Sequence, residues 1–321
     1  MPKFSEAVAP SQAFLYGEHA VLYGSPALAM SVDIKTRARI TEVEDKIIEI
    51  KSDKFSQGLK WRYDRERPEE SPLFPLASGL MDLMRRYEFN RGLMVEISSE
   101  VPVSSGMASS ASTSAAISAA FLSLIGEKPE KSLLLDIVYD FERRIHGKAS
   151  KTGPACAVLG GLVWVEWRDE RMEVSRIDPK RDLSIAISCS GLPSETKKLV
   201  SMVSKKYNEM RDVMERIISA ISIVTLEGRR AIESGDLVRA GELMNINHGL
   251  LSAMGVSNHV LDDIAWMMRK FGAYGAKLSG AGGGGCVIGL SDDPEMLAKN
   301  LSASYLSFAA KVSLEGAKVI K

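Results

Sequence analysis

Lys277–Cys286 reads Lys-Leu-Ser-Gly-Ala-Gly-Gly-Gly-Gly-Cys and lies between two apolar runs. Five of the six residues from 280 to 285 are glycine, so this loop has almost no side chains. A chain accepts that loss of backbone order where another group must approach the main chain closely. Phosphate is the usual ligand of such a loop, because consecutive backbone N–H groups can bind its oxygens. The stretch therefore predicts a phosphate-binding loop, with a wide β-turn as the alternative that needs no ligand.

The same glycines fit a second, weaker pattern. Gly280, Gly282 and Gly285 match G-x-G-x-x-G, the fingerprint of dinucleotide-binding folds. That fingerprint requires a helix directly after the glycines. Here Cys286–Leu290 has the apolar character of a strand, so we reject dinucleotide binding.

A serine-rich segment earlier in the chain has related chemistry. A strand pattern leads into Ser104-Ser105-Gly106, and Met107–Leu124 has the composition of a helix. The start of a helix carries unsatisfied N–H groups and a partial positive charge, which suit phosphate. The Walker A pattern does not occur in the sequence. The alternative is a serine-capped helix whose small residues serve packing.

Two other segments combine polar residues with glycine. Ala9–Gln12 and the following Tyr16–Gly24 predict a wall of a substrate site or, without function, an ordinary turn. In Glu142–Gly153 a helix ends in a glycine-punctuated loop, and Glu142 offers a hard oxygen ligand for Mg²⁺. The alternative for that segment is a solvated helix end with its usual basic residues.

Composition bounds the remaining possibilities. The 321 residues are enough for two domains, and 41 basic residues balance 41 acidic ones, which gives no support to nucleic-acid binding. Neither a signal-peptide core nor about 18 uninterrupted apolar residues is found, so we expect no membrane span and a cytoplasmic location. Cys156, Cys189 and Cys286 are scattered, and we expect them to be free thiols.

The hydrophobic patterns mix strands and helices without strict alternation, which favours an α+β fold. Strand patterns cover 27–43, 46–51, 93–98, 158–167, 183–188, 274–278, 286–290 and 310–314, and residues 52–72 read as a polar excursion. Helical spacing covers 74–88, 133–145, 194–233, 236–253 and 258–271. A boundary near 180–195 predicts domains of residues 1–185 and 186–321.

Taken together and in this order, these segments resemble the GHMP kinase superfamily, and in particular its mevalonate kinase branch. The resemblance spans nearly the whole chain and implies a ribosomal protein S5 domain 2-like N-terminal domain, a ferredoxin-like C-terminal domain, and Mg·ATP bound between them. It implies a small-molecule acceptor and, since relatives are often homodimers, a homodimer.

The resemblance also assigns roles to residues. The phosphate-binding positions that it implies are Pro102, Ser104, Ser105, Gly106, Met107, Ala108, Ser109, Ser110, Gly280, Gly282 and Gly283. The implied Mg²⁺ ligands are Ser110 and Glu142. The substrate side would include His19, Lys148, Lys151 and Ser279, and the catalytic positions are Gln12, Glu18, His19, Thr152 and Gly153.

Two departures from the family pattern concern the reacting groups. Mevalonate kinases have Ala-Pro-Gly-Lys where this chain has Ala9-Pro10-Ser11-Gln12, so Gln12 replaces the lysine. They also have a catalytic Asp eleven positions after the residue matching Glu142, and Gly153 stands there. Phosphoryl transfer depends mainly on positioning and charge neutralisation, and a general base adds about 10²–10⁴-fold. We therefore still expect a kinase.

The missing carboxylate favours a more anionic acceptor, with Lys148 and Lys151 nearby in sequence. We expect mevalonate 3-phosphate, phosphorylated on its primary 5-hydroxyl. Its phosphate, with a second pKa of about 6, can itself accept the hydroxyl proton. The alternatives are an ordinary mevalonate 5-kinase that uses another base, such as His19 or a water, and a non-catalytic sensor that binds ATP and a metabolite.

Overall fold

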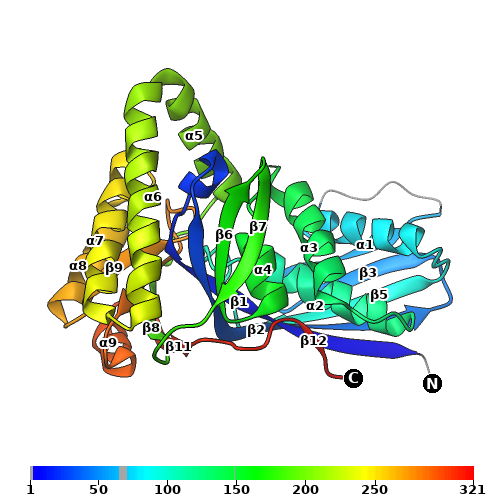
Figure 1. Ribbon diagram of the computed structural model, residues 1–321. Coiled ribbons are helices and arrows are strands. Elements are labelled where there is room, and N and C mark those ends of the chain that lie inside the picture. Colours follow the sequence, from blue (N-terminus) through cyan, green and yellow to red (C-terminus); the bar gives the residue numbers. More distant parts are fainter. Residues whose placement is uncertain (1–2, 65–70, 148) are drawn as a thin grey trace.

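The computed structural model describes residues 3–64, 71–147 and 149–321 and contains two β-sheets (Figure 1). The first sheet has the strand order β12-β1-β2-β5-β3-β4, with β6 paired to β2 and β7 paired to β6. Its strands are β1 (Phe4–Tyr16), β2 (Ala27–Val43), β3 (Ile47–Ser52), β4 (Phe55–Arg62), β5 (Gly92–Ser99), β6 (Leu162–Arg168), β7 (Arg171–Ile177) and β12 (Lys318–Val319). The β3–β5 pair is parallel.

Several helices lie beside this sheet (Figure 1). They are α1 (Phe74–Arg86), α2 (Ser109–Leu124), α3 (Lys131–His146), α4 (Thr152–Leu159) and the short 3-10 helix η1 (Ala20–Tyr23). Helix α2 packs against β1, β2 and α3, and twelve of its sixteen residues are buried. Its Ala and Ser side chains are small enough to allow this close packing on several sides.

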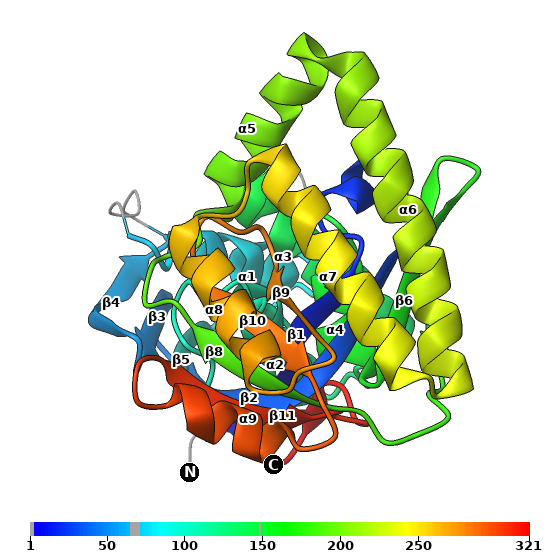
Figure 2. The ribbon, with the colours of Figure 1, turned by 90° about the vertical axis from the view of Figure 1, so that its left-hand side faces the viewer.

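The second sheet is antiparallel, with the order β11-β8-β10-β9. It comprises β8 (Ser184–Cys189), β9 (Gly275–Ser279), β10 (Cys286–Leu290) and β11 (Leu306–Lys311), with α5 (Thr196–Glu209), α6 (Arg211–Ser234), α7 (Leu237–Met254), α8 (His259–Lys270) and α9 (Pro294–Leu301). Helices α7 and α8 cover the face of β9 and β10 that is turned to the viewer in Figure 2. The glycine-rich loop connects β9 to β10.

The two sheets share a core, and the C-terminal segment pairs with the first sheet. One buried cluster joins Leu15 and Leu28 of the first sheet to Ile187 and Ile288 of the second. After β11 the chain returns to the first sheet, where β12 pairs with the outer edge of β1 (Figure 1). The two halves are therefore tied together by packing and by the chain itself.

The expected α+β class is confirmed, and several boundaries need correction. The polar stretch 52–72 contains β4, an edge strand whose residues are mostly exposed and therefore show little apolar alternation. Gly153 lies in the first turn of α4, where we expected a loop. The strand expected at 310–314 is β11, Leu306–Lys311. The sequence patterns missed β7 and α9.

Candidate active site

A cavity of about 300 Å³ lies where the two halves of the molecule meet. Its walls come from β1, the turn before η1, the loop before α2, the end of α3, the start of α4, the loop before α5, and the glycine-rich loop. The lining residues central to the chemistry are Gln12, Phe14, Glu18, His19, Ser104, Ser105, Gly106, Ala108, Ser109, Ser110, Glu142, His146, Ser150, Gly153, Ser194, Thr196, Gly280 and Ala281. Most positions expected for catalysis and phosphate binding thus surround one space.

The start of α2 opens into this cavity with its N–H groups uncapped by side chains. Ala108 occupies the N-cap position with φ of +53° and makes no side-chain cap, and Ser109 and Ser110 line the cavity. The first-turn N–H groups and the helix dipole together favour an anion at this point. A polyphosphate fits the electrostatics of this helix end.

The glycines of the glycine-rich loop lie close to the protein's own main chain, and Gly280 also lines the cavity. A Cβ on Gly280 would lie 2.5 Å from the Gly106 carbonyl oxygen, and one on Gly285 would lie 2.6 Å from that of Ser105. The N–H groups of Gly283 and Gly285 donate to the carbonyls of Val256 and Leu192. The glycines are required by the protein's own main chain, and the loop braces the serine-rich loop from behind.

The expectation that all three cysteines are free thiols is wrong for two of them. Cys189 on β8 and Cys286 on β10 are register partners and form a disulfide, whereas Cys156 is free and buried. The two residues are 97 positions apart in sequence, and only the sheet register brings them together. The disulfide fixes the end of the glycine-rich loop to the neighbouring strand.

Glu142 and Ser110 form a site suited to a hard cation. Glu142 is 7% exposed, and its Oε1 has no hydrogen-bond partner among the described residues. Burial raises the pKa of this carboxyl to about 7, although a hydrogen bond with Ser110 opposes the shift. The Ser110 hydroxyl lies 3.2 Å from His146 Nε2. One carboxylate and one hydroxyl suit Mg²⁺, which usually takes its other ligands from phosphate and water.

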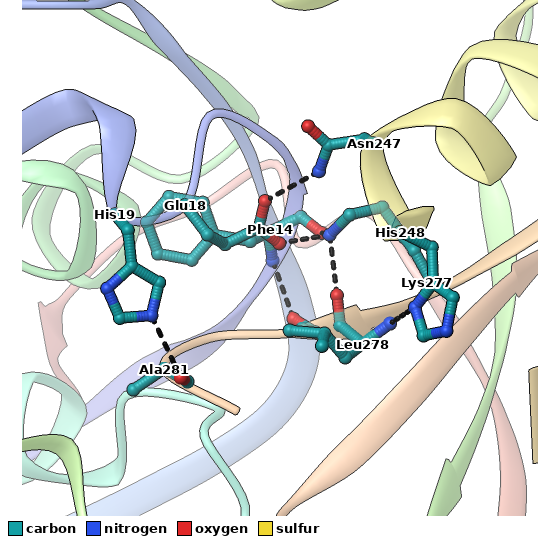
Figure 3. Close-up of polar contacts among 9 residues, drawn as sticks. Phe14, Glu18, His19, Asn247, His248, Lys277, Leu278 and Ala281 are labelled. Carbon is teal, nitrogen blue, oxygen red and sulfur yellow. Dashed lines mark hydrogen bonds and ion pairs between the residues drawn. The ribbon is translucent and has the colours of Figure 1, made fainter. Parts of the chain in front are cut away.

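Glu18 proves to be part of a buried ion pair (Figure 3). Its carboxylate contacts the Lys277 ammonium and accepts a hydrogen bond of 3.1 Å from Asn247. Lys277 is fully buried and also donates to the carbonyls of Phe14 and Leu278. Burial raises the pKa of Glu18 and lowers that of Lys277, and each partner opposes the shift of the other. The pair joins β9 to the turn before η1.

His19 follows directly and faces the cavity. Its backbone has φ of +57°, and its Nε2 lies 2.9 Å from the Ala281 carbonyl oxygen (Figure 3). Burial lowers its pKa, so the ring is neutral at pH 7. A neutral ring that donates to Ala281 leaves its other nitrogen as an acceptor.

Our sequence analysis gave no role to Lys277 and Asn247, which contact Glu18 beside the cavity. It also gave none to the lining residues His146, Ser150, Ser194 and Thr196. Lys277 opens the glycine-rich stretch, and a lysine within an apolar strand pattern indicates a buried partner. Asn247 lies on α7, and its distance of 229 positions from Glu18 hides the contact.

The two departures from the family pattern lie side by side. Gln12 is 4% exposed, and its N–H donates to the Met107 carbonyl at 3.1 Å. A Cβ built on Gly153 would lie 3.9 Å from Gln12 Oε1 and 3.3 Å from the Ala108 Cβ. Thr152, beside Gly153, is fully buried and accepts a hydrogen bond from Ser150.

The other positions expected on the substrate side make contacts within the protein. The Ser279 hydroxyl accepts a hydrogen bond from the Phe14 N–H and so holds β1 against β9. The Lys151 ammonium lies 5.5 Å from the centre of the Tyr139 ring. Lys148 lies outside the described residues.

No helix in the described ranges has the length and hydropathy of a membrane span.

Known proteins share both the sequence and the architecture. The family model for the GHMP kinases N terminal domain matches residues 75–161, and that for the GHMP kinases C terminal domain matches residues 229–305. The chain is 31% identical to the mevalonate kinase of Pyrococcus horikoshii, over 99% of this chain and 98% of that one. It is also 31% identical to the mevalonate kinase of Methanothermobacter thermautotrophicus, over 97% and 99% of the two chains.

A solved structure agrees. The crystal structure of the Methanococcus jannaschii mevalonate kinase aligns with a TM-score of 0.80 at 25% identity and covers 98% of this chain and 99% of that one. The fold expected from the resemblance is therefore confirmed. The chain belongs to the GHMP kinase family, among relatives named mevalonate kinase, and is accordingly an ATP-dependent phosphotransferase that acts on an alcohol.

Proposed function

We propose that this kinase phosphorylates the primary 5-hydroxyl of mevalonate 3-phosphate and produces mevalonate 3,5-bisphosphate. The observation that carries the proposal is the neutral pair formed by Gln12 and Gly153 at the acceptor side. The carboxylates lining the described part of the cavity are Glu18 and Glu142. Glu18 is neutralised by Lys277, and Glu142 is assigned to Mg²⁺, so among the described lining residues no free carboxylate would repel a phosphate on the acceptor.

In this proposal each wall of the cavity has one task. The start of α2 holds the triphosphate, Ser110 and Glu142 hold Mg²⁺, and Gly280 with Ala281 closes the site beside them. Bound Mg²⁺ would neutralise charge on the phosphate oxygens. Hydroxyl groups of Ser150, Ser194 and Thr196 line the cavity and offer donors to an anionic acceptor.

The transfer balances without a carboxylate base. The 5-oxygen forms a bond to the γ-phosphorus, the bond from that phosphorus to the oxygen of ADP breaks, and the hydroxyl proton passes to the 3-phosphate of the same substrate. That phosphate is mostly a dianion at pH 7, because its second pKa is about 6. A loose transition state needs little help from a base before the bond is largely formed.

The alternative is an ordinary mevalonate 5-kinase. It is favoured by the relatives named mevalonate kinase, at 31% identity over nearly the whole chain. In that case a neutral His19 or a water would take the proton.

Parallel assays distinguish the two. Purified protein with Mg·ATP is given mevalonate or mevalonate 3-phosphate, ADP release is measured, and the products are identified by phosphorus NMR. We expect kcat/KM to be at least about 100-fold higher for mevalonate 3-phosphate, the lower range of a base contribution. Faster use of plain mevalonate would refute the proposed acceptor, and nucleotide binding without turnover of either would indicate a sensor.

A further inference from the structure

We propose that the Gln12 side chain holds the acceptor hydroxyl in line with the γ-phosphate, and that Gly153 and Ala108 keep the space in front of it open. The inference rests on the proposed function for the acceptor's identity. It adds which residue orients the alcohol and why the opposite position carries no side chain.

The first observation is an unsatisfied amide. Gln12 is 4% exposed, lines the cavity, and has an Oε1 without a hydrogen-bond partner among the described residues. Buried polar side-chain atoms nearly always have a partner, so an exception at a cavity wall indicates a ligand. A hydroxyl hydrogen is the partner that an amide oxygen accepts.

The second observation is the position of Gln12 between the site proposed for ATP and the site proposed for the alcohol acceptor. Its own N–H is bound to the Met107 carbonyl, which precedes the start of α2 by two residues. The side chain therefore lies beside the helix end assigned to the triphosphate. A group there can orient an alcohol at the near-attack distance, about 3–3.5 Å from phosphorus.

The third observation is the space that Gly153 leaves. A Cβ at position 153 would lie 3.3 Å from the Ala108 Cβ, 3.4 Å from the Ala111 Cβ and 3.9 Å from Gln12 Oε1. Any longer side chain would enter the space that faces the amide or press against α2. Glycine at 153 thus keeps the hydrogen-bonding face of Gln12 accessible to a substrate.

Together these contacts define specificity. An amide accepts a hydrogen bond but does not take up a proton at neutral pH, so Gln12 orients the hydroxyl without deprotonating it. Acceptors that carry their own basic phosphate near the hydroxyl then react faster than acceptors without one. Gln12 contributes positioning, and the substrate supplies the base.

The test uses the full chain and Gln12→Met, which keeps the volume and removes the hydrogen bond. We expect kcat for mevalonate 3-phosphate to fall by about 10–100-fold, while the KM for ATP changes less than about twofold. Gly153→Val, whose side chain extends beyond the Cβ, should give a similar loss. Gly249→Ala, on α7 with open space around it, is the matched control and should keep wild-type kcat.

A second measurement separates orientation from structure. Because Gln12→Met removes an unsatisfied buried oxygen, its melting temperature should equal or exceed that of the wild type, whereas a structural role predicts a lower value. A kcat close to that of the wild type, or a loss of kcat together with a lowered melting temperature, would overturn the inference. If the wild type prefers plain mevalonate, the proposed acceptor is wrong and the same loss is expected with mevalonate.

Discussion

At the residue scale, the buried pair of Lys277 and Glu18 has a large energetic consequence. Both side chains are almost completely inaccessible, with side-chain exposures of 0% and 1%. Two ions removed from water are tolerable only while each neutralises the other. The pair therefore holds the turn that places His19, and losing one member leaves an uncompensated charge in the core.

Lys277→Met should lower the free energy of unfolding by about 3–5 kcal/mol, because Glu18 would remain buried without its cation. The double variant Lys277→Met/Glu18→Gln should recover a large part of that loss. Urea denaturation of the wild type, the single variant and the double variant measures both effects. A loss below about 1 kcal/mol in the single variant would contradict the buried ion pair.

The buried carboxyl group of Glu142 lowers the free energy of unfolding when it is ionised and no cation is bound. Burial raises its pKa from 4.5 to about 7, so the folded protein holds a proton in this range that the unfolded chain releases. Without Mg²⁺, its contribution to stability is therefore lost as the pH rises from about 4.5 to about 7, by about 3 kcal/mol in total.

Glu142→Gln should remove this pH dependence. Without Mg²⁺ we expect the variant to be more stable than the wild type at about pH 8 and similar to it at about pH 4.5, as measured by thermal melting. Its kinase activity should fall by at least about 100-fold, since a Mg²⁺ ligand is lost. Equal melting temperatures at the higher pH would show that the carboxyl ionises without cost.

At the element scale, the glycine-rich loop shows both the reach and the limit of sequence reasoning. The need for a close approach to the main chain is predictable, because the glycines alone imply it. The glycines alone do not predict which group approaches. At Gly282 it is the protein's own main chain, because a Cβ there would lie 2.1 Å from the Val256 carbonyl oxygen. A local pattern reports crowding, whereas the identity of the neighbour depends on tertiary contacts.

Gly282→Ala should therefore lower the free energy of unfolding by about 2–4 kcal/mol, from backbone strain at φ of +82° and the clash with Val256. Gly249→Ala is the matched control and should raise stability by about 0.5–1 kcal/mol, because Gly249 lies in an exposed part of a helix. Chemical denaturation compares them. Equal stabilities of the two variants would show that the loop tolerates side chains.

The same distinction explains which site residues are predictable. Ser110, Glu142, Gln12 and Gly153 belong to contiguous motifs, and the structure brings them to one cavity. The disulfide and the contact of Asn247 with Glu18 depend on sheet register and on helix placement, which link distant segments. Neither has a local signal in the sequence.

The disulfide predicts a thiol count. Denatured protein without reductant should show one reactive thiol per chain, Cys156, and three after reduction; in the native state Cys156 is buried and should not react. Replacing Cys189 and Cys286 by serine should lower the free energy of unfolding by about 2–5 kcal/mol. Three reactive thiols in the unreduced denatured protein would contradict the cross-link.

At the scale of the whole molecule, the C-terminal segment links the second half back to the active site. The Ala317 N–H donates to the Ala157 carbonyl on α4, and Gly161 donates to the Ser313 carbonyl. Helix α4 carries Thr152 and Gly153 at its other end. The segment therefore supports the wall of the cavity from outside.

Deletion of residues 313–321 should lower the melting temperature by more than about 5 °C, because α4 and β1 lose these hydrogen bonds. We expect kcat to fall as well, since Gly153 moves with α4. Lys318→Ala is the control. It removes only a solvent-exposed ion pair with Glu315 within the same segment and leaves the main-chain hydrogen bonds in place. A truncated protein with wild-type melting and turnover would show that α4 needs no such support.

The pairing of β12 with β1 also orders events during protein synthesis. Ala7 on β1 pairs with Val319 on β12, so the outer edge of β1 stays bare while the ribosome makes all the residues between them. A bare edge can pair with other nascent chains. The synthesis of β12 is thus the event that closes this edge of the first sheet, and nascent chains that still lack β12 are the ones most exposed to mispairing.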